Sequence, residues 1–331
     1  MYELLGICLT LSALLAVNAL MSLVAEGVWR LSAPALQRLS AGLRAEILFT
    51  LRVSAPAIAI IAVAAVFVPA FIAHEPHTTG EVVSKKLALL ALISATGFGL
   101  AFTKAFRSWL ATHALLRDWL ARAQRIQLEG VGTPTFSLSH SFPIIAVVGT
   151  FRPRLFIAEH LLQSLTKAEL TAAIAHECGH LAARDNLKRS LLRVCRDVLI
   201  LPCGRALDRA WSEAAECAAD EHAARQSALT ALNLASALVK IAKMIPAKGQ
   251  AAIPVGVFLV GAEEGRGVKA RVRRLLDLAS RDQRRLGSIH AKILPVTALG
   301  LLAAIPIAVA SNPHVLINVH HLIERVVGVL C

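Results

Sequence analysis

The sequence predicts a mainly α-helical membrane protein with four transmembrane helices and a water-exposed α+β domain between the third helix and the fourth. The first reason is composition: 56% of the 331 residues are hydrophobic, 17% are charged and the mean hydropathy is +0.61, values that argue against a wholly soluble protein. The second reason is that Leu, Ala, Val and Ile form runs of membrane length. We therefore expect a membrane region at 1–106, a domain at 107–290, and a fourth span with a short tail at 291–331.

The first predicted span begins close to the N-terminus and is interpreted as a retained membrane helix. Only Glu3 is charged ahead of it, whereas a secretory signal needs a basic start and a shorter apolar region, so we expect the N-terminus outside. The four predicted spans cover about residues 4–25, 53–73, 87–106 and 293–310.

Arginine is unevenly distributed around these spans. It is abundant between spans one and two, directly after span three and directly before span four, which the positive-inside rule assigns to the cytoplasm. The domain at 107–290 is therefore predicted to be cytoplasmic. The formal charge of +13 suits the surface of a lipid bilayer. The basic stretch at 271–285 has no recognition motif around it, so we expect no direct binding of nucleic acid.

The cytoplasmic domain is predicted to begin with strands and to continue with helices. Thr166 and Glu169 have the spacing of a capping box, which opens a helix. The next helix is amphipathic and contains three arginines, so we expect it on the domain or the inner leaflet rather than across the membrane. In chain order the expected elements are strands at 144–148 and 155–158, helices at 166–183, 186–201 and 206–226, and an amphipathic outer-leaflet helix in the tail at 311–331.

One pentapeptide in the helix predicted at 166–183 has the spacing of a metal site. His176 and His180 are four residues apart, so both imidazoles lie on one helical face and can reach one metal ion. Glu177 is turned from that face by about 100° and can lie beside the metal without ligating it. The pattern His-Glu-x-x-His indicates a zinc centre with Glu177 as general base.

The following predicted helix supplies a third ligand. Glu216 completes a His₂Glu set, which for Zn²⁺ is typical of a catalytic rather than a structural site. Asp220, one turn later, can accept the second ring N–H of a zinc-bound histidine. Glu213 is an alternative ligand, but no Asp follows it four residues later. The simplest alternative is that all these groups are ordinary surface residues of two amphipathic helices.

These motifs and their surroundings resemble the gluzincin membrane metallopeptidases, most closely the BlaR/MecR type. The similarity covers residues 140–225 and includes His176-Glu-x-x-His180 and the run Arg184-Asp185-Asn186-Leu187. It implies a gluzincin-type zinc protease domain between spans three and four, at the cytoplasmic face of a bacterial-type inner membrane. It also implies cleavage of a cytosolic repressor, and autocleavage. Antibiotic sensing is not expected, because the short segment 311–331 stands where β-lactam sensors carry a penicillin-binding domain.

Two other functions stay open at this point. HtpX-type quality-control proteases share the His-Glu-x-x-His and Glu-x-x-x-Asp patterns, and a non-catalytic receptor or scaffold would keep zinc for stability alone. The intact Glu177 argues against the scaffold. His222 and Arg225 are candidate oxyanion donors without an assignment. The sequence also does not reveal which of the two predicted strands is the sheet edge to which an extended peptide would add.

Overall fold

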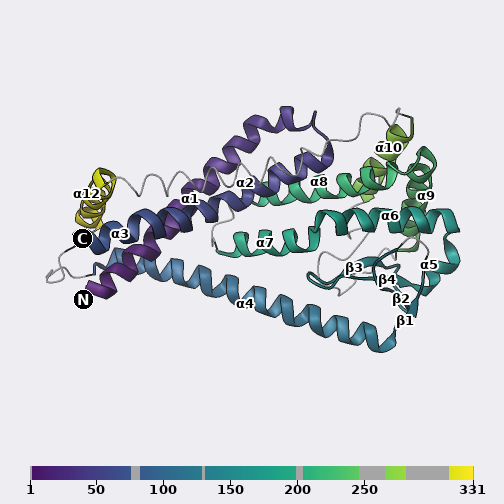
Figure 1. Ribbon diagram of the computed structural model, residues 1–331, viewed down its shortest axis with the longest axis horizontal. Helices are drawn as coiled ribbons and strands as arrows, with labels where there is room; N and C mark the ends of the chain where they lie inside the picture. Colours follow the sequence, from purple (N-terminus) through teal and green to yellow (C-terminus); the bar gives the residue numbers. More distant parts are fainter. Residues whose placement is uncertain are drawn as a thin grey trace.

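Three long helices extend from one end of the molecule, and a smaller domain of helices and strands forms the other end (Figure 1). The computed structural model describes residues 2–75, 83–128, 131–198, 204–245, 265–280 and 313–330. The long helices are α1 (Tyr2–Leu36), α2 (Ala41–Ala62), which continues through the π-helical segment η1 (Val63–Phe67) into α3 (Val68–His74), and α4 (Lys85–Arg122).

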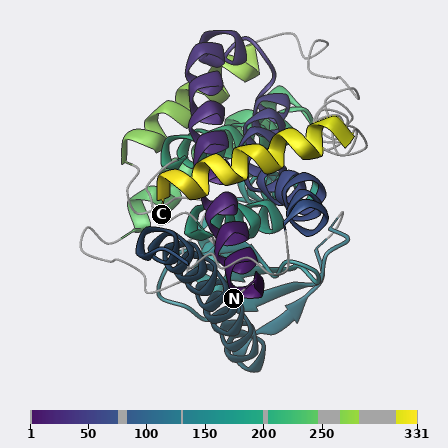
Figure 2. The same cartoon turned by 90° about the vertical axis from the view of Figure 1, so that its left-hand side faces the viewer.

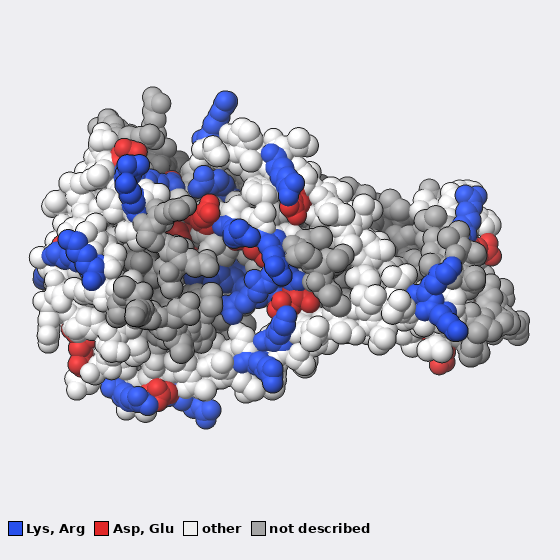
Figure 3. Space-filling model, turned by 180° about the vertical axis from the view of Figure 1, so that it is seen from behind, with Lys and Arg blue, Asp and Glu red and all other residues white. Residues whose placement is uncertain are grey.

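All three long helices are apolar and long enough to cross a membrane. They contain the spans predicted at 4–25, 53–73 and 87–106, and each continues beyond its predicted limits. The fourth predicted span, at 293–310, lies outside the described residues. In Figure 3, white uncharged surface separates the Lys and Arg side chains at the middle of the molecule from those near the α12 end, as expected where helices face lipid.

The end opposite the domain holds the N-terminus, α3 and α12 (Pro313–Leu330) (Figure 1). Figure 2 looks at this end and shows α12 running across the tips of the long helices. His320 of α12 stacks on His74 with the ring centroids 5.5 Å apart, and its Nδ1 lies 3.8 Å from the Glu75 carboxylate. The helix predicted for the tail is therefore present and packs on the bundle end, while its position at a leaflet stays a prediction.

The domain contains a four-stranded sheet in the order β1-β2-β4-β3. The strands are β1 (Gln124–Ile126), β2 (Thr135–Leu138), β3 (Ile145–Val148) and β4 (Arg154–Ala158). β3 pairs antiparallel with β4, β4 parallel with β2, and β2 antiparallel with β1, so β3 forms one edge. The sequence predicts β3 and β4 but misses β1 and β2, which are short and carry polar side chains.

The helices that follow agree with the predicted order. The capping box is confirmed, because Thr166 accepts from the Glu169 N–H and the Glu169 carboxylate accepts from the Thr166 N–H. The predicted domain begins with a helix continuous with span three, since α4 passes residue 106 unbroken. The described helices are α5 (Glu159–Ser164), α6 (Lys167–Ala183), α7 (Asp185–Val198), α8 (Arg205–Ala224), α9 (Ala228–Met244) and α10 (Gly265–Ser280).

Two apolar clusters position α8. The larger one fills the domain between the sheet, α6, α9 and α10, with Phe156, Leu238 and Leu275 fully buried. The second joins α1 and α2 to α8 through Leu48 and Trp211. Because α8 contributes to both, it lies between the membrane helices and α6.

Candidate metal centre

The two histidines of the predicted motif lie on one face of α6. Their ring centroids are 4.9 Å apart and the rings are nearly perpendicular. His176 is completely buried, and the His180 side chain is 12% exposed. The helical spacing therefore brings the two imidazoles together at a largely enclosed site, as the sequence predicts.

Gly179 allows α8 to approach this face of α6 closely. A Cβ atom at Gly179 would lie 2.9 Å from Cα of Ala219 and 3.1 Å from Cβ of His222, which is closer than carbon atoms pack. The absence of that side chain lets the two helices come within reach of a shared ligand. Glu216 of α8 then points toward the histidine pair, whereas Glu213 is exposed.

The three candidate ligand side chains converge through specific atoms. Nε2 of His176 lies 3.6 Å from Oε2 of Glu216, and Nε2 of His180 lies 3.6 Å from Oε1 of the same carboxylate. One ligand atom from each residue lies within 4.8 Å of the others. Tetrahedral zinc with bonds of about 2.0–2.1 Å needs ligand atoms about 3.3 Å apart, close to the distances found here. In addition, Oε2 of Glu216 is buried without a hydrogen bond, so this oxygen is available as a ligand. The residues therefore fit a divalent metal ion.

The other ring nitrogens are held by carboxylates. Nδ1 of His176 lies 2.9 Å from Asp220, and Nδ1 of His180 lies 2.7 Å from Asp185. Because a carboxylate accepts, each Nδ1 carries the proton and each Nε2 is left as the ligand atom. The sequence predicts the contact with Asp220. It misses Asp185, which can fold back because Arg184 ends α6 in the left-handed conformation, with φ of 55°.

Arg271 of α10 is a buried cation at this site, a role that the sequence does not indicate. The sequence marks this residue only as part of the basic stretch at 271–285. Its guanidinium donates to both Asp220 oxygens at 2.7 and 3.0 Å and lies 3.3 Å from Oε2 of Glu216. The spacing of the apolar residues could have indicated that Arg271 is buried. Arg271 lies on the same helix face as the buried Leu275 and Leu278, and a solvent-exposed arginine is not expected on a buried face.

The electrostatics of the site favour positive charge. Burial lowers the pKa of His176, but hydrogen bonds to Asp220 and Glu216 outweigh burial and raise it to about 9. Burial opposes ionisation of Glu216 too, yet His180, His176 and Arg271 hold its pKa well below 4.5. The pKa of Asp220 is likewise lowered to about 2, chiefly by Arg271 against the effect of burial. The raised pKa of His176 means that, without a metal ion, this imidazole holds a second proton beside the two ionised carboxylates. A divalent cation would take the place of that proton.

Glu177 occupies a buried position next to the cluster. Burial raises the pKa of its carboxyl group above the ordinary 4.5, opposed by His180 and His176. Its Oε2 accepts the N–H of Val147 at 3.2 Å. A glutamate with a raised pKa beside a metal site suits a group that takes up and returns a proton near neutral pH.

The edge strand next to Glu177 is β3, which answers the question that the sequence leaves open. The Val147 N–H donates to Glu177, and the Val147 carbonyl accepts from Nδ2 of Asn186 at 3.0 Å, so both groups point away from β4. In an antiparallel ladder Ile145, two residues earlier, has the same orientation. The outward backbone groups of Val147 already have partners, so Ile145 is the position at which β3 presents its edge beside the cluster.

Two candidate oxyanion donors, His222 and Arg225, and two free cysteines lie near the ligands along α6 and α8. His222 packs beside Gly179, and Arg225 is exposed at the end of α8, where solvation explains its charge. Cys178 and Cys217 are partly buried free thiols whose pKa burial raises. Raised pKa values keep these thiols protonated, consistent with packing roles.

A His₂Glu cluster with an adjacent buried glutamate is the arrangement of metallopeptidases of the His-Glu-x-x-His class, and here it occurs beside apolar helices of membrane length. The model of Peptidase family M48 matches residues 135–265, from β2 to the first residue of α10. This match indicates a metallopeptidase and supports a membrane-type zinc-dependent family, but it does not single out the BlaR/MecR type. No curated protein and no solved structure matches the chain.

Proposed function

We propose that this chain is an integral membrane zinc endopeptidase that hydrolyses peptide bonds of protein substrates at the cytoplasmic face of the membrane. The observation that carries the proposal is the convergence of both Nε2 atoms and the Glu216 carboxylate beside buried Glu177. The family match over residues 135–265 supports the same chemistry.

In this proposal the protein's own groups share the work of hydrolysis. A zinc ion held by His176, His180 and Glu216 would supply Lewis acidity to the scissile carbonyl and lower the pKa of water toward about 7. Glu177 removes the proton from the attacking water and gives it to the leaving amine. The carboxylates of Asp220 and Asp185 hold both imidazoles in the tautomer that exposes Nε2. β3 orients the extended substrate.

The cytoplasmic side and a regulatory role rest on separate support. The excess of arginine around the predicted spans supports the cytoplasmic side. The resemblance of residues 140–225 to the BlaR/MecR type supports cleavage of a repressor or another signalling protein.

The proposed chemistry is tested with the full chain purified in lipid nanodiscs. Wild type should bind one zinc ion per chain and cleave a casein-like substrate, and Glu177→Gln should keep the zinc and lose cleavage. Glu213→Gln is the matched control, because Glu213 is exposed on the same helix as Glu216. This substitution should change neither zinc content nor cleavage. Equal cleavage by wild type and Glu177→Gln would refute the peptidase. Full zinc without cleavage in either protein would support the non-catalytic scaffold.

The regulatory role is tested by comparing proteins that accumulate in cells carrying wild type or Glu177→Gln. One or a few soluble signalling proteins should persist uncut in the variant. Broad accumulation of membrane proteins would instead support quality control of the HtpX type.

A further inference from the structure

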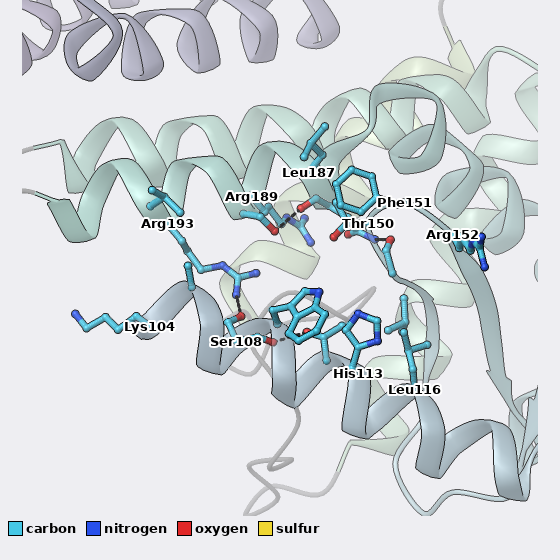
Figure 4. Close-up of a pocket in the computed structure, with 18 of the residues that line it drawn as sticks. Lys104, Ser108, His113, Leu116, Thr150, Phe151, Arg152, Leu187, Arg189 and Arg193 are labelled. Carbon is cyan, nitrogen blue, oxygen red and sulfur yellow. Dashed lines mark hydrogen bonds between the residues drawn. The ribbon is translucent and has the colours of Figure 1, made fainter. Parts of the chain in front are cut away.

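A cavity of about 620 Å³ opens beside the metal centre (Figure 4). It is bounded by α4 from Ala101 to Leu116, by the end of β3 and the turn after it, and by α7 from Asn186 to Asp197. Two of its lining residues contact the candidate centre directly: Val147 donates its N–H to Glu177 at 3.2 Å, and Arg189 donates to Glu216 at 3.0 Å. The cavity therefore adjoins the site at which a peptide would be cut.

The cavity combines apolar surface with an excess of positive charge. Trp109 of α4 is 53% exposed and Phe151 of the β3–β4 turn is 87% exposed, so both offer aromatic surface to an occupant. The cationic lining residues are Lys104, Arg152, Arg189 and Arg193, whereas Asp197 is the lining carboxylate among the described residues. This lining complements a segment that carries an acidic side chain next to apolar ones.

Arg193 and Arg152 are the lining cations without an ion pair among the described residues, and of the two Arg193 is partly buried whereas Arg152 is exposed. Arg189 pairs with Glu216, while Asp197 lies 3.3 Å from Lys104 and 3.7 Å from Arg196. Arg193 donates to the Ser108 hydroxyl at 3.0 Å, across the space between α7 and α4 (Figure 4). A neutral hydroxyl uses one of five guanidinium donors and cancels no charge.

The pKa of Arg193 is consistent with this environment. Burial lowers the pKa of Arg193, the neighbouring cations Arg189 and Arg196 lower it further, and Asp197 offsets only part of this decrease. A carboxylate placed in the cavity would relieve this repulsion and form a charge-assisted bidentate hydrogen bond.

We infer that this cavity is a specificity subsite that takes an aspartate or glutamate side chain of the substrate, with Arg193 as its counter-ion and Trp109 and Phe151 contacting the residues beside it. The inference rests on the proposed peptidase and deepens it by naming the substrate class: extended acidic segments with neighbouring apolar residues. Ser108 then serves as the resting partner of Arg193 that the substrate carboxylate replaces.

The test uses the full zinc-loaded chain in nanodiscs of zwitterionic lipid. Quenched fluorescent peptides differ only in carrying Glu, Gln or Lys at one position at a time on either side of the cut. At one of these positions, wild type should cleave the Glu peptide with a kcat/KM about tenfold above that of the Gln peptide, as a charge-assisted hydrogen bond permits. Lys at the same position should be cleaved least.

Charge-changing variants assign this preference to one residue. Arg193→Gln should bring the Glu-to-Gln ratio near one, and Arg193→Glu should favour the Lys peptide, a gain that a misfolded protein would not show. Arg196→Gln removes the same charge from the same helix outside the cavity lining and should keep the wild-type preference.

The outcomes separate this inference from the proposed function. If zinc-loaded wild type cleaves none of the peptides, the peptidase itself is refuted. If it cleaves them without an acidic preference, or if Arg193→Gln keeps that preference, the subsite is refuted and the peptidase stands. Weaker binding of Arg193→Gln to anionic vesicles with an unchanged peptide preference would assign Arg193 to lipid headgroups and likewise refute the subsite.

Discussion

At the scale of single residues, Arg271 contacts both the candidate ligand Glu216 and Asp220, the carboxylate that orients His176. Its guanidinium holds Asp220 through two hydrogen bonds, lies against Glu216 and is 3.4 Å from both ring nitrogens of His176. The same positive charge also repels a metal ion. The balance between ligand positioning and charge repulsion determines whether a substitution at Arg271 lowers or raises zinc affinity.

We predict that Arg271→Met lowers zinc affinity about ten- to hundredfold, because groups that orient metal ligands typically contribute that much. Arg271→Lys should fall between, since lysine keeps the charge but not the two-pronged hydrogen bond. Chelator competition on the purified chain measures the affinity, and exposed Arg273→Met on the same helix is the control. A gain in zinc affinity for Arg271→Met would show that repulsion dominates and would contradict the positioning role.

The residues around the histidines show how far spacing alone can predict a site. His176 and His180 share one face of α6, and Glu216 and Asp220 share one face of α8, because the members of each pair are one helical turn apart, a spacing that the sequence encodes directly. Asp185 could not be placed in this way, because its contact depends on the left-handed backbone at Arg184. Arg271 could not either, because it arrives from a helix whose packing the local sequence does not specify.

At the scale of helices, the close packing of α6 on α8 sets the position of Glu216. Gly179 is the point of nearest approach, and Ala219 faces it from α8. A side chain at Gly179 therefore has to move α8.

We expect Gly179→Ala to reduce the free energy of unfolding by about 1–3 kcal/mol, the usual cost of overpacking, and to weaken zinc binding. Thermal unfolding and chelator competition measure the two effects. Gly99→Ala on α4 is the matched control, since nothing lies within 4 Å of a Cβ there. Unchanged stability and zinc affinity in Gly179→Ala would mean that α8 is not positioned by this contact.

Glu169 joins α6 to α9 as well as capping α6. It is buried and accepts hydrogen bonds from Ser236 at 2.6 Å and Lys240 at 2.7 Å. Burial raises the pKa of its carboxyl group, but these hydrogen bonds and the Thr166 contact outweigh burial and lower it from 4.5 to about 2. Because the folded pKa is depressed, the stabilisation is complete above about pH 4.5 and is lost as pH falls toward 2.

Glu169→Gln should therefore cost about 2 kcal/mol at pH 7, a value reduced for the partial exposure of Lys240. The difference from wild type, followed by denaturant unfolding, should stay constant down to about pH 5 and shrink below it. Exposed Glu159→Gln supplies the control. A difference that widens on acidification would contradict the sign of the pKa change.

The elements were predictable to different degrees. The capping box, the helices α6 to α8 and the strands β3 and β4 follow from local patterns of caps and apolar residues. β1 and β2 do not, because the sequences Gln-Arg-Ile and Thr-Phe-Ser-Leu lack the continuous apolar run of β3, and such strands are stabilised by their partners. The role of β3 as the edge follows from strand order, which depends on the whole sheet.

At the scale of the whole molecule, buried charges tie the membrane helices to the domain. Glu221 of α8 accepts the Ala41 N–H at the start of α2 and the guanidinium of Arg274 on α10. Arg52 of α2 is buried and pairs with Asp208 of α8 at 3.1 Å. The helix that carries Glu216 is thus held from both sides.

The topology predicts which ends of the molecule face which side of the membrane. In single-cysteine variants on intact cells, an impermeant maleimide should label Glu3→Cys at the bundle end. It should not label Arg38→Cys at the α1–α2 turn or Arg225→Cys on the domain until the membrane is permeabilised. All three positions are exposed in the folded protein, so labelling of Arg38→Cys without permeabilisation would reverse the orientation.

The most direct test of the account is the zinc coordination sphere measured by X-ray absorption on the purified full chain. We predict one zinc ion per chain with two imidazole nitrogens and a carboxylate oxygen at about 2.0–2.2 Å, and the loss of this signature in Glu216→Gln. A zinc–sulfur distance near 2.3 Å, as Cys178 or Cys217 would give, or a spectrum unchanged by Glu216→Gln, would contradict it.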